Sequence, residues 1–281
     1  MTKSPSRAAD YSPGDVHRVR QLCLYVATIL GDLLDDIVIV GGLVPSLLIS
    51  PENLPDDRDL HVGTKDLDLG LALTLLDDKR YREVATRLRK SGFGPDTNER
   101  GNPTFQRWKY ESNNFNVTID FLIPPPDTDA RPGTTKNLEE DFAAIIMPGL
   151  GLVHEHNFKF QLNDKTPHGD KATREIRVCG LGPFIVLKAL AMKGRNEPKD
   201  AYDLLYVLRN HPGGIEAAAE ALRPLLENEH CKEAIGILEN DFYDLDYIGP
   251  RRVAAFLYGK TDEATQAQAY ATVTDLLTEL K

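Results

Sequence analysis

Apolar residues recur at two kinds of spacing along this chain, strand-like and helix-like, and the pattern changes near residue 180. Before that point, helical repeats are interspersed with short β-branched or alternating runs that are typical of strands. The elements expected there, in chain order, are a helix over 16–34, a strand over 37–40, a helix started by 43–49, a loop over 50–64, a strand over 66–73, a helix over 79–91, and a hairpin of strands over 104–110 and 115–123 that turns at 112–114. Strands over 154–162 and 175–178 are expected to pair across a polar loop, whereas residues 127–150 show no clear pattern.

The part of the chain after Gly180 has the periodicity of helices only. Helices are expected over 181–193, 199–209, 215–226, 231–238 and 261–280. Residues 1–14 carry Pro, Ser and Gly without periodicity and are expected to be a disordered tail. The pattern therefore predicts an α+β fold with a first domain over 15–180 and a helical C-terminal domain over 181–281.

Composition narrows the class of protein. The 281 residues are 41% hydrophobic and 27% charged, which is ordinary for a globular protein. The net charge of -10 argues against coating nucleic acid through bulk charge, but the stretches 79–109 and 171–199 are basic and leave room for a local basic cleft. No apolar run approaches the ~20 residues that span a bilayer, and the polar N-terminus is unlike a signal peptide. Three isolated cysteines form neither a disulfide framework nor a zinc site, so we expect a cytoplasmic protein without membrane contact.

Three aspartates and two adjacent glycines indicate phosphate chemistry. Asp66 and Asp68 stand two apart in an expected strand, so their carboxylates face the same side. Asp120 lies in a second, apolar strand, and neighbouring strands would bring the three together. Three like charges need a cation, and Mg²⁺ prefers oxygen ligands while keeping positions open for substrate phosphates. Gly41 and Gly42 follow a strand and leave backbone N–H groups that suit a triphosphate.

An Asp-x-Asp pair by itself is weak evidence, because an acidic chain forms such pairs by chance. This chain has others at 57–59, 127–129 and 244–246. The pair at 66–68 differs from the others in the order of elements around it. A strand, two glycines, a helix and a loop precede the Asp-x-Asp strand, and a lone Asp lies on a later strand. Carboxylate sets that hold one or two Mg²⁺ ions are usual in phosphoryl and nucleotidyl transfer.

The order Gly-Gly, Asp-x-Asp, Asp resembles the polymerase-β-like nucleotidyltransferase superfamily. The segments IVIVGGLVPSLL and GTKDLDLGL, joined to LKALAMKGRNEPKDAYDLLYVL, are similar to the AbiEii toxin family, which includes the MenT toxins. The resemblance implies a polymerase-β-like nucleotidyltransferase domain with a mixed sheet, followed by a helical C-terminal domain. It also implies an NTP as substrate, Mg²⁺ as cofactor, tRNA 3′ ends as acceptor, and a partner antitoxin. The same resemblance implies that a Lys and an Asp of the helical half act beside the carboxylates at the nucleotide. By position, Lys188 or Lys193 would contact the phosphates, and Asp200 would be the later acidic residue of the family pattern.

The chain departs from the superfamily pattern in three places. Leu43 follows Gly42 where the superfamily commonly has Ser or Thr, and the nearest hydroxyl is Ser46. An insertion lengthens the gap between Gly42 and Asp66. The toxin family does not always retain a third acid, so Asp120 is either a metal ligand or structural.

The remaining candidates each have a plainer alternative. Thr64 and Lys65 either contact phosphate or shape the start of the strand, and Arg107 either meets the triphosphate or acceptor or is a surface charge. Lys188 and Lys193 lie on an apolar helix and either bind phosphate or extend to the surface. Asp200 follows Pro198 and either serves the site or favours the start of its helix. No histidine pair has metal-site spacing, and Trp108 and Tyr110 are expected to be packing residues.

We therefore expect an Mg²⁺-dependent nucleotidyltransferase of the toxin type. An NTP would lie across Gly41 and Gly42, Asp66 and Asp68 would hold the metal, and the two basic stretches would contact RNA. One alternative is a nucleotidyltransferase that modifies a small molecule, such as an aminoglycoside, or a protein hydroxyl. The other is a catalytically inactive nucleotide-binding module.

Overall fold

The chain divides into two compact units in the computed structural model, which describes residues 6–55, 58–72, 78–112, 115–195 and 197–281. The sheet unit comprises Pro13–Val44 and Gly63–Cys179. The helical unit comprises the stretch up to Ser12, Pro45–Val62 and Gly180–Lys281. The last break between the two units falls at Gly180, and the domains over 15–180 and 181–281 stay a prediction. Residues 45–62, which include the predicted insertion, group with the helical unit.

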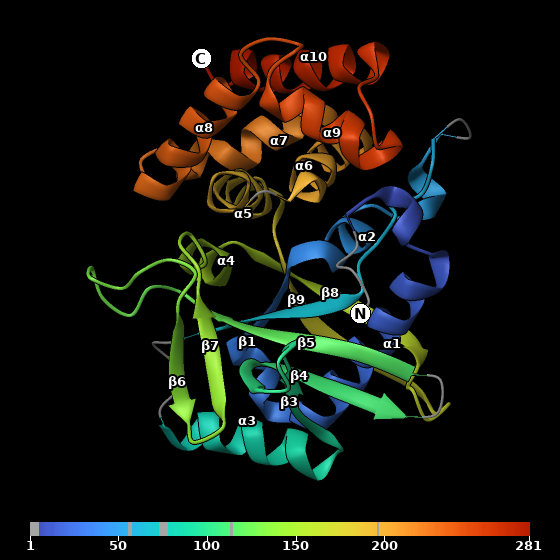
Figure 1. Ribbon diagram of the computed structural model, residues 1–281, viewed down its shortest axis with the longest axis vertical. Coiled ribbons are helices and arrows are strands. Elements are labelled where there is room, and N and C mark those ends of the chain that lie inside the picture. The colour runs from blue at the N-terminus through green and yellow to red at the C-terminus, as the bar shows by residue number, and fades with distance from the viewer. Residues whose placement is uncertain (1–5, 56–57, 73–77, 113–114, 196) are drawn as a thin grey trace. The chain divides into compact units, whose positions relative to one another are not determined.

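The sheet unit is built on one mixed sheet (Figure 1), whose order is β3-β4-β5-β2-β1-β9-β8, with β7 beside β5 and β6 beside β7. Its strands are β1 (Ile37–Val40), β2 (Asp66–Leu71), β3 (Phe93–Thr97), β4 (Pro103–Ser112), β5 (Phe115–Ile123), β6 (Thr135–Glu139), β7 (Phe142–Ile146), β8 (Asn157–Lys165) and β9 (Lys171–Cys179). β1 pairs antiparallel with β2 and parallel with β9, and β2 pairs parallel with β5. The predicted α+β class with a mixed sheet and C-terminal helices is confirmed.

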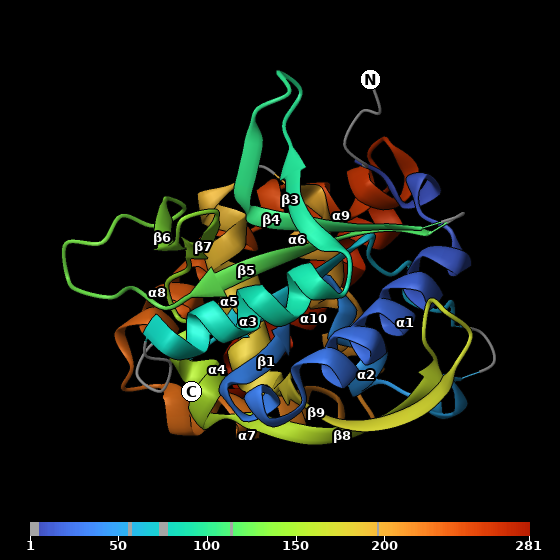
Figure 2. The same ribbon diagram turned by 90° about the horizontal axis from the view of Figure 1, so that it is seen from below.

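Two helices, α1 (Pro13–Leu30) and α3 (Asp78–Lys90), lie side by side over one face of this sheet, as Figure 2 shows. Alternation explains which side chains face them. Leu67, Leu69 and Leu71 are fully buried, whereas Asp66 and Asp68, which alternate with them, are only partly buried. On the next strands Trp108 and Phe121 pack edge to face, 5.9 Å between ring centroids, and Arg89 of α3 lies 5.2 Å from the Trp108 ring. The carboxylates therefore occupy the opposite face of the sheet from α1 and α3.

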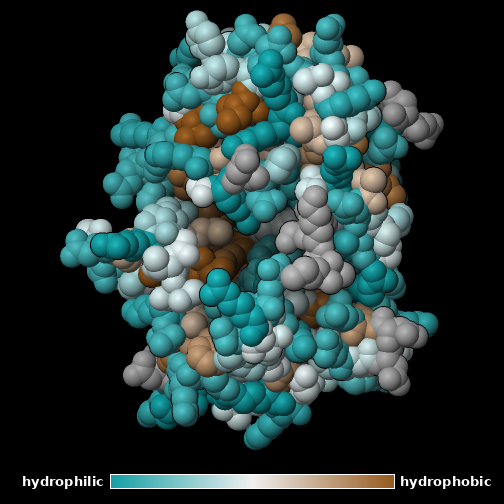
Figure 3. Space-filling model, viewed as in Figure 1, coloured by the Kyte–Doolittle hydropathy of each residue, from teal (hydrophilic) through white to brown (hydrophobic). Residues whose placement is uncertain are grey.

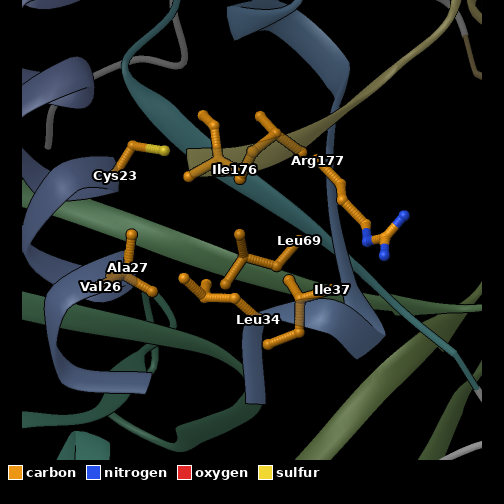
Figure 4. A pocket seen from close by; sticks show the side chains of 9 residues that line it. Cys23, Val26, Ala27, Leu34, Ile37, Leu69, Ile176 and Arg177 are labelled. Carbon is orange, nitrogen blue, oxygen red and sulfur yellow. The ribbon is translucent and has the colours of Figure 1, made fainter. Parts of the chain in front are cut away.

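A small apolar cavity lies between α1 and the sheet (Figure 4). It is lined by Cys23, Val26, Ala27, Leu34, Ile37, Ile39, Leu69, Ile176 and Arg177, and the Arg177 guanidinium points away from it. Burial raises the pKa of the Cys23 thiol to about 12, so this thiol stays protonated. Because its lining is mostly apolar, this cavity is a packing defect of the core rather than a polar binding site.

The helical unit consists of six longer helices and short elements from earlier in the chain. They are α2 (Pro45–Leu48), α5 (Leu181–Gly194), α6 (Pro198–Asn210), α7 (Gly214–Leu222), α8 (Glu229–Asp241), α9 (Ile248–Tyr258) and α10 (Glu263–Glu279), with 3₁₀ turns over Ala8–Asp10, Pro51–Asn53 and Arg223–Leu225. The sequence pattern did not predict α9. Hydrophilic side chains cover most of the face seen in Figure 3.

Several local predictions need correction. Residues 127–150 contain β6 and β7, and the strand expected from residue 154 begins at Asn157 because α4 (Gly151–Glu155) precedes it. The expected tail over 1–14 includes Ala8–Asp10 as a 3₁₀ turn and the start of α1, while its first five residues lie outside the described ones. The expected turn residues Asn113 and Asn114 also lie outside them. Among the described residues, every helix is too short or too polar to pass through a lipid bilayer.

Candidate active site

The predicted aspartates share one face of the sheet. Asp68 is the parallel register partner of Asp120, and Asp66 is that of Thr118, so β2 and β5 present these side chains in adjacent rows. The Thr118 hydroxyl donates a hydrogen bond to the Asp66 carboxylate. The Asp66 side chain is 41% exposed and that of Asp120 only 11%. Strand alternation and register thus place the three acids on one face of the sheet, and Asp66 is more accessible than Asp120.

The turn after β1 is shaped around the Asp68 carboxylate. Val40, the last residue of β1, is paired with Asp68 in the antiparallel register. Gly41 has φ +70°, and a Cβ built there would lie 1.8 Å from Asp68 Oδ2. The Gly42 N–H is directed at the same oxygen, 3.4 Å from N to O. Gly41 is therefore required both by its backbone conformation and by the carboxylate against it.

Substitution of Gly41 by Ala is expected to displace the Asp68 carboxylate and destabilise the fold by about 1–3 kcal/mol, because a left-handed backbone is strained for Ala. We predict a lowered urea midpoint together with loss of any transfer activity. Gly94→Ala is the matched control, since a Cβ at Gly94 meets no atom within 4 Å. Unchanged stability and activity in Gly41→Ala would show that the turn does not depend on glycine.

Arg107 binds Asp120 rather than standing free for a substrate. The two residues are directly opposite on β4 and β5. Arg107 Nε donates to Oδ1 at 2.7 Å and Nη2 to Oδ2 at 2.6 Å, and Nη2 lies 3.9 Å from Asp66 Oδ2. The hydrogen bonds to Asp120 raise the pKa of Arg107, and the charges of Asp66 and Asp68 add to this. Arg107 thus neutralises one of the three acids, a role that the sequence pattern did not predict.

The donor chemistry of Asp66 and Asp68 fits a magnesium ion bound together with a nucleotide. Mg²⁺ is usually held by one or two carboxylates plus substrate phosphates and water. Within the described residues, no group of three or more His, Cys, Asp or Glu side chains is arranged to hold a metal. Both oxygens of Asp120 accept from Arg107, so its role as a third ligand stays a prediction with a competing partner.

Other predicted residues near this face have structural contacts or belong elsewhere. The Thr64 hydroxyl is buried and bonds the backbone of Asp66, donating to its carbonyl at 3.2 Å, so it shapes the start of β2. Lys65 is half-buried beside it. Ser46 lies in α2 and belongs to the helical unit.

The helical unit contains a second charged cluster, which is buried. Lys188 Nζ donates to Asp200 Oδ1 at 2.9 Å and to Asp203 Oδ2 at 2.6 Å. Lys199 donates to both oxygens of Asp203, at 2.7 and 2.9 Å. Arg195 forms a bidentate pair with Asp200, both bonds at 2.8 Å, and its side chain is 57% exposed. We call these five residues together with His61 the buried network.

Mutual charge keeps the acids and Lys188 ionised despite their burial. Burial alone would lower the pKa of Lys188, but the charges of Asp203 and Asp200 outweigh it and raise that pKa. Burial would likewise raise the pKa of Asp203, but Lys188 and Lys199 hold it well below its ordinary value. Burial lowers the pKa of Lys199. A buried set of this kind is stable only while its charges stay matched.

The predicted helical-half residues have different surroundings. Lys188 and Asp200 belong to the buried network, whereas Lys193 is 65% exposed and pairs with Glu233 at 2.7 Å. Asp200 lies in the first turn of α6, but its carboxylate bonds Lys188 and Arg195 rather than capping the helix. Neither Lys is therefore an unpaired cation.

His61, one of the histidines without metal-site spacing, belongs to the buried network. Its Nε2 lies 2.9 Å from Asp203 Oδ1, its ring stacks on Tyr202 at 5.3 Å, and Tyr206 meets its edge at 4.8 Å. The backbone N–H of Val62 donates to the Tyr202 hydroxyl at 3.1 Å. The insertion is therefore anchored on α6, directly before the chain enters Gly63 and β2.

Stability is expected to fall between pH 7 and pH 4, with His61 as a main cause. Burial lowers the pKa of His61 from 6.5 to about 4 in the folded chain. Between these values the unfolded chain binds more protons, so acidification favours unfolding, by roughly 3 kcal/mol in total. The measurement is the free energy of unfolding in urea at pH 7, 6 and 5. His61→Gln should show a shallower pH dependence than the wild type, and identical slopes would refute the assignment.

Acidic neighbours neutralise most of the two basic stretches. In 79–109, six of nine cations form ion pairs: Arg80 with Asp36, Arg82 with Glu139, Arg87 with Asp32 and Glu83, Arg89 with Asp141, Arg107 with Asp120, and Lys109 with Asp96 and Glu111. In 171–199, Arg177, Lys188, Lys193, Arg195 and Lys199 are also paired. Contact between these two stretches and RNA phosphates therefore stays a prediction. The pairing of most of these cations with acids counts against it.

Taken with the mixed sheet and its carboxylate face, comparison with known families identifies the class as a nucleotidyltransferase. A family model described as nucleotidyl transferase AbiEii toxin, type IV TA system, matches residues 58–273. The chain belongs to this family, as its sequence motifs predicted. The matched span contains Asp66, Asp68 and the buried-network residues of α5 and α6, whereas Gly41 and Gly42 precede it. No curated protein matches the chain.

Proposed function

We propose that this protein transfers a nucleotidyl group from an NTP to the 3′ end of a tRNA, with Mg²⁺ bound at Asp66 and Asp68. One observation carries the proposal: the two carboxylates stand on one face of the sheet, and the Gly41–Gly42 turn is built against the second of them. Membership of a nucleotidyltransferase toxin family supports the same reaction class.

Each part of this face has a distinct task in the proposal. The backbone at Gly41 and Gly42 offers N–H groups and close approach to the phosphates of the NTP. Asp66 and Asp68 hold the metal, which when bound neutralises phosphate charge and polarises the α-phosphate. Arg107 pairs with Asp120 and compensates its negative charge, which lowers the repulsion among the three acids where the metal and nucleotide would bind. The acceptor hydroxyl would release its proton to solvent as its oxygen bonds the α-phosphorus and the bond from that phosphorus to pyrophosphate breaks.

The helical unit is proposed to contribute cations and an acid toward the phosphates. The resemblance names Asp200 and either Lys188 or Lys193, and of these two lysines Lys188 forms an ion pair with Asp200 within the buried network. Arg195 is the most exposed cation of that network and is bidentate on Asp200, so it is the member best suited to reach a ligand. We propose that Lys188 acts by holding Asp200 and that Arg195, rather than Lys193, contacts phosphate.

The family implies a cognate antitoxin, and we propose that the toxin works in the cytoplasm, where NTPs and tRNA are available. Toxicity predicts arrested growth on expression of the wild-type chain. Arrest that disappears in Asp68→Asn would link toxicity to the carboxylate face.

The experiment is incubation with each α-labelled NTP, Mg²⁺ and total tRNA, beside Asp68→Asn. Label on tRNA that is absent with the variant and with EDTA is the expected result. No labelled product with any NTP, from a protein shown to be folded, would overturn the proposal and leave an inactive nucleotide-binding module.

A second candidate acceptor is a small molecule or a protein hydroxyl. The pairing of six cations in 79–109 favours it, because a tRNA contacted through many phosphates needs unpaired basic side chains. The same assay with an aminoglycoside mixture and with a protein extract separates the two. Label on these acceptors but not on tRNA would select the second candidate.

A further inference from the structure

One short run of the helical unit exposes an unusual amount of apolar surface. Of the six exposed large hydrophobic side chains in the described residues, four lie within 243–248. Tyr243 is 78% exposed, Tyr247 50%, Ile248 42% and Leu245 41%. Single exposed apolar residues are ordinary, whereas a contiguous patch marks an interaction surface.

This patch borders a groove. An open groove of about 400 Å³ is lined by Tyr247 and Ile248 together with Asp246, Arg251, Arg252 and Ala255, so α9 supplies most of it. The Tyr243 and Tyr247 rings lie 6.5 Å apart at an interplanar angle of 72°. Tyrosines of this kind offer large contact area with little loss of conformational freedom on binding.

The fold holds the run in a fixed conformation. The Asp246 N–H donates to Asp244 Oδ1 at 2.9 Å, and the Tyr247 N–H donates to the Asp244 carbonyl at 3.0 Å. Gln266 of α10 donates to the Leu245 carbonyl at 3.1 Å and to Asp246 Oδ1 at 3.0 Å. The apolar side chains are thus displayed on an ordered turn, which reduces the entropy lost when a partner binds.

Charge around the patch selects the kind of partner. Four acids, Glu239, Asp241, Asp244 and Asp246, lie within or just before it, against two arginines of α9. Those arginines face acids already: Arg251 lies 3.7 Å from Asp246, and Arg252 lies 3.7 Å from Asp241. The remaining excess is negative, which disfavours RNA phosphates and complements a cationic partner.

We propose that residues 243–248 and the adjoining groove of α9 form a docking surface for a basic amphipathic helix of a partner protein. The apolar side of such a helix would cover Tyr243, Tyr247 and Ile248. Its Lys and Arg side chains would meet Asp244 and the neighbouring acids. This docking surface does not depend on nucleotide transfer. A failed test of one proposal therefore leaves the other unchanged.

The test measures binding of a fluorescein-labelled 18-residue helix of Lys and Leu at helical spacing by anisotropy, with the full chain and without NTP. A Glu and Leu helix with the same leucine positions is the peptide control. The variants are Tyr243→Ser with Tyr247→Ser, and Asp244→Asn, which keeps an acceptor for the Asp246 N–H. Asp127→Asn with Asp129→Asn is the control for loss of charge elsewhere.

We expect the Lys and Leu helix to bind at least tenfold more tightly than the Glu and Leu helix. The double Tyr variant should weaken that binding at least tenfold and Asp244→Asn about threefold, while the Asp127 and Asp129 variant stays within twofold of the wild type. Circular dichroism confirms that each variant is folded. Equal binding of both peptides, or unchanged binding in the double Tyr variant, would overturn the proposal.

Discussion

Asp68→Asn is expected to fold as the wild type does and to lose nucleotidyl transfer by about a thousand-fold, the effect of removing several kcal/mol of transition-state stabilisation. Asn keeps the shape of the side chain beside Gly41 and can still accept from the Gly42 N–H. It removes the negative charge that the metal needs. The effect should appear in the rate with saturating NTP and acceptor, because the lost interaction serves the reacting phosphate.

The matched control is Asp129→Asn, in an Asp-x-Asp pair outside the sheet. Asp127 and Asp129 are exposed, and Asp127 Oδ1 accepts from the backbone N–H of Asp129. We expect this variant to retain the wild-type rate. A thermal unfolding scan of both variants separates lost chemistry from lost structure. Retention of more than a tenth of the wild-type rate by folded Asp68→Asn would rule out Asp68 as a metal ligand.

The largest effect on stability is expected from Asp203→Asn. The Asp203 side chain is fully buried and accepts from Lys188 and Lys199 at 2.6–2.9 Å. Removing its charge leaves Lys199 without its carboxylate and Lys188 with Asp200 alone. Breaking a buried ion pair from one side costs about 3–5 kcal/mol, so the free energy of unfolding should fall by that amount. Urea titration at pH 7, followed by circular dichroism, measures it.

Glu233→Gln provides the control for this prediction. It breaks the exposed pair with Lys193, in which the side chains are 65% and 41% exposed. Such pairs contribute about 0.2–1 kcal/mol. If Asp203→Asn proved no more destabilising than Glu233→Gln, the buried network would not be the main electrostatic support of the helical unit.

Local patterns were sufficient for most elements. The β-branched run at Ile37–Val40 predicts a strand from residue type, and the alternation through Asp66–Leu71 predicts one from side-chain period. The same alternation predicts that Asp66 and Asp68 share a face. By contrast, α9 was missed because its first turn contains Gly249 and Pro250, which resemble a loop. Proline is tolerated there, since N–H groups of a first turn have no intrahelical partner.

Contacts between distant segments could not be predicted. Arg107 meets Asp120 because β4 and β5 pair in one particular register, which a single sequence does not specify. His61 meets Asp203 across 142 residues, and only the folded helical unit brings the insertion onto α6. The pairing of the basic stretches is likewise tertiary, because Asp36, Glu139 and Asp141 lie outside them or far along the chain. Charge counted along the sequence therefore overestimated the basic surface that is left without acidic partners.

The most direct measurement is Mn²⁺ binding by electron paramagnetic resonance in the presence of a non-hydrolysable NTP analogue. It tests whether Asp66 and Asp68 bind the metal ion together with the nucleotide. The identity of the acceptor does not have to be known. We predict one bound Mn²⁺ per chain in the wild type and in Asp129→Asn, and at least tenfold weaker binding in Asp68→Asn. Equal Mn²⁺ affinity in the wild type and Asp68→Asn would contradict the assignment.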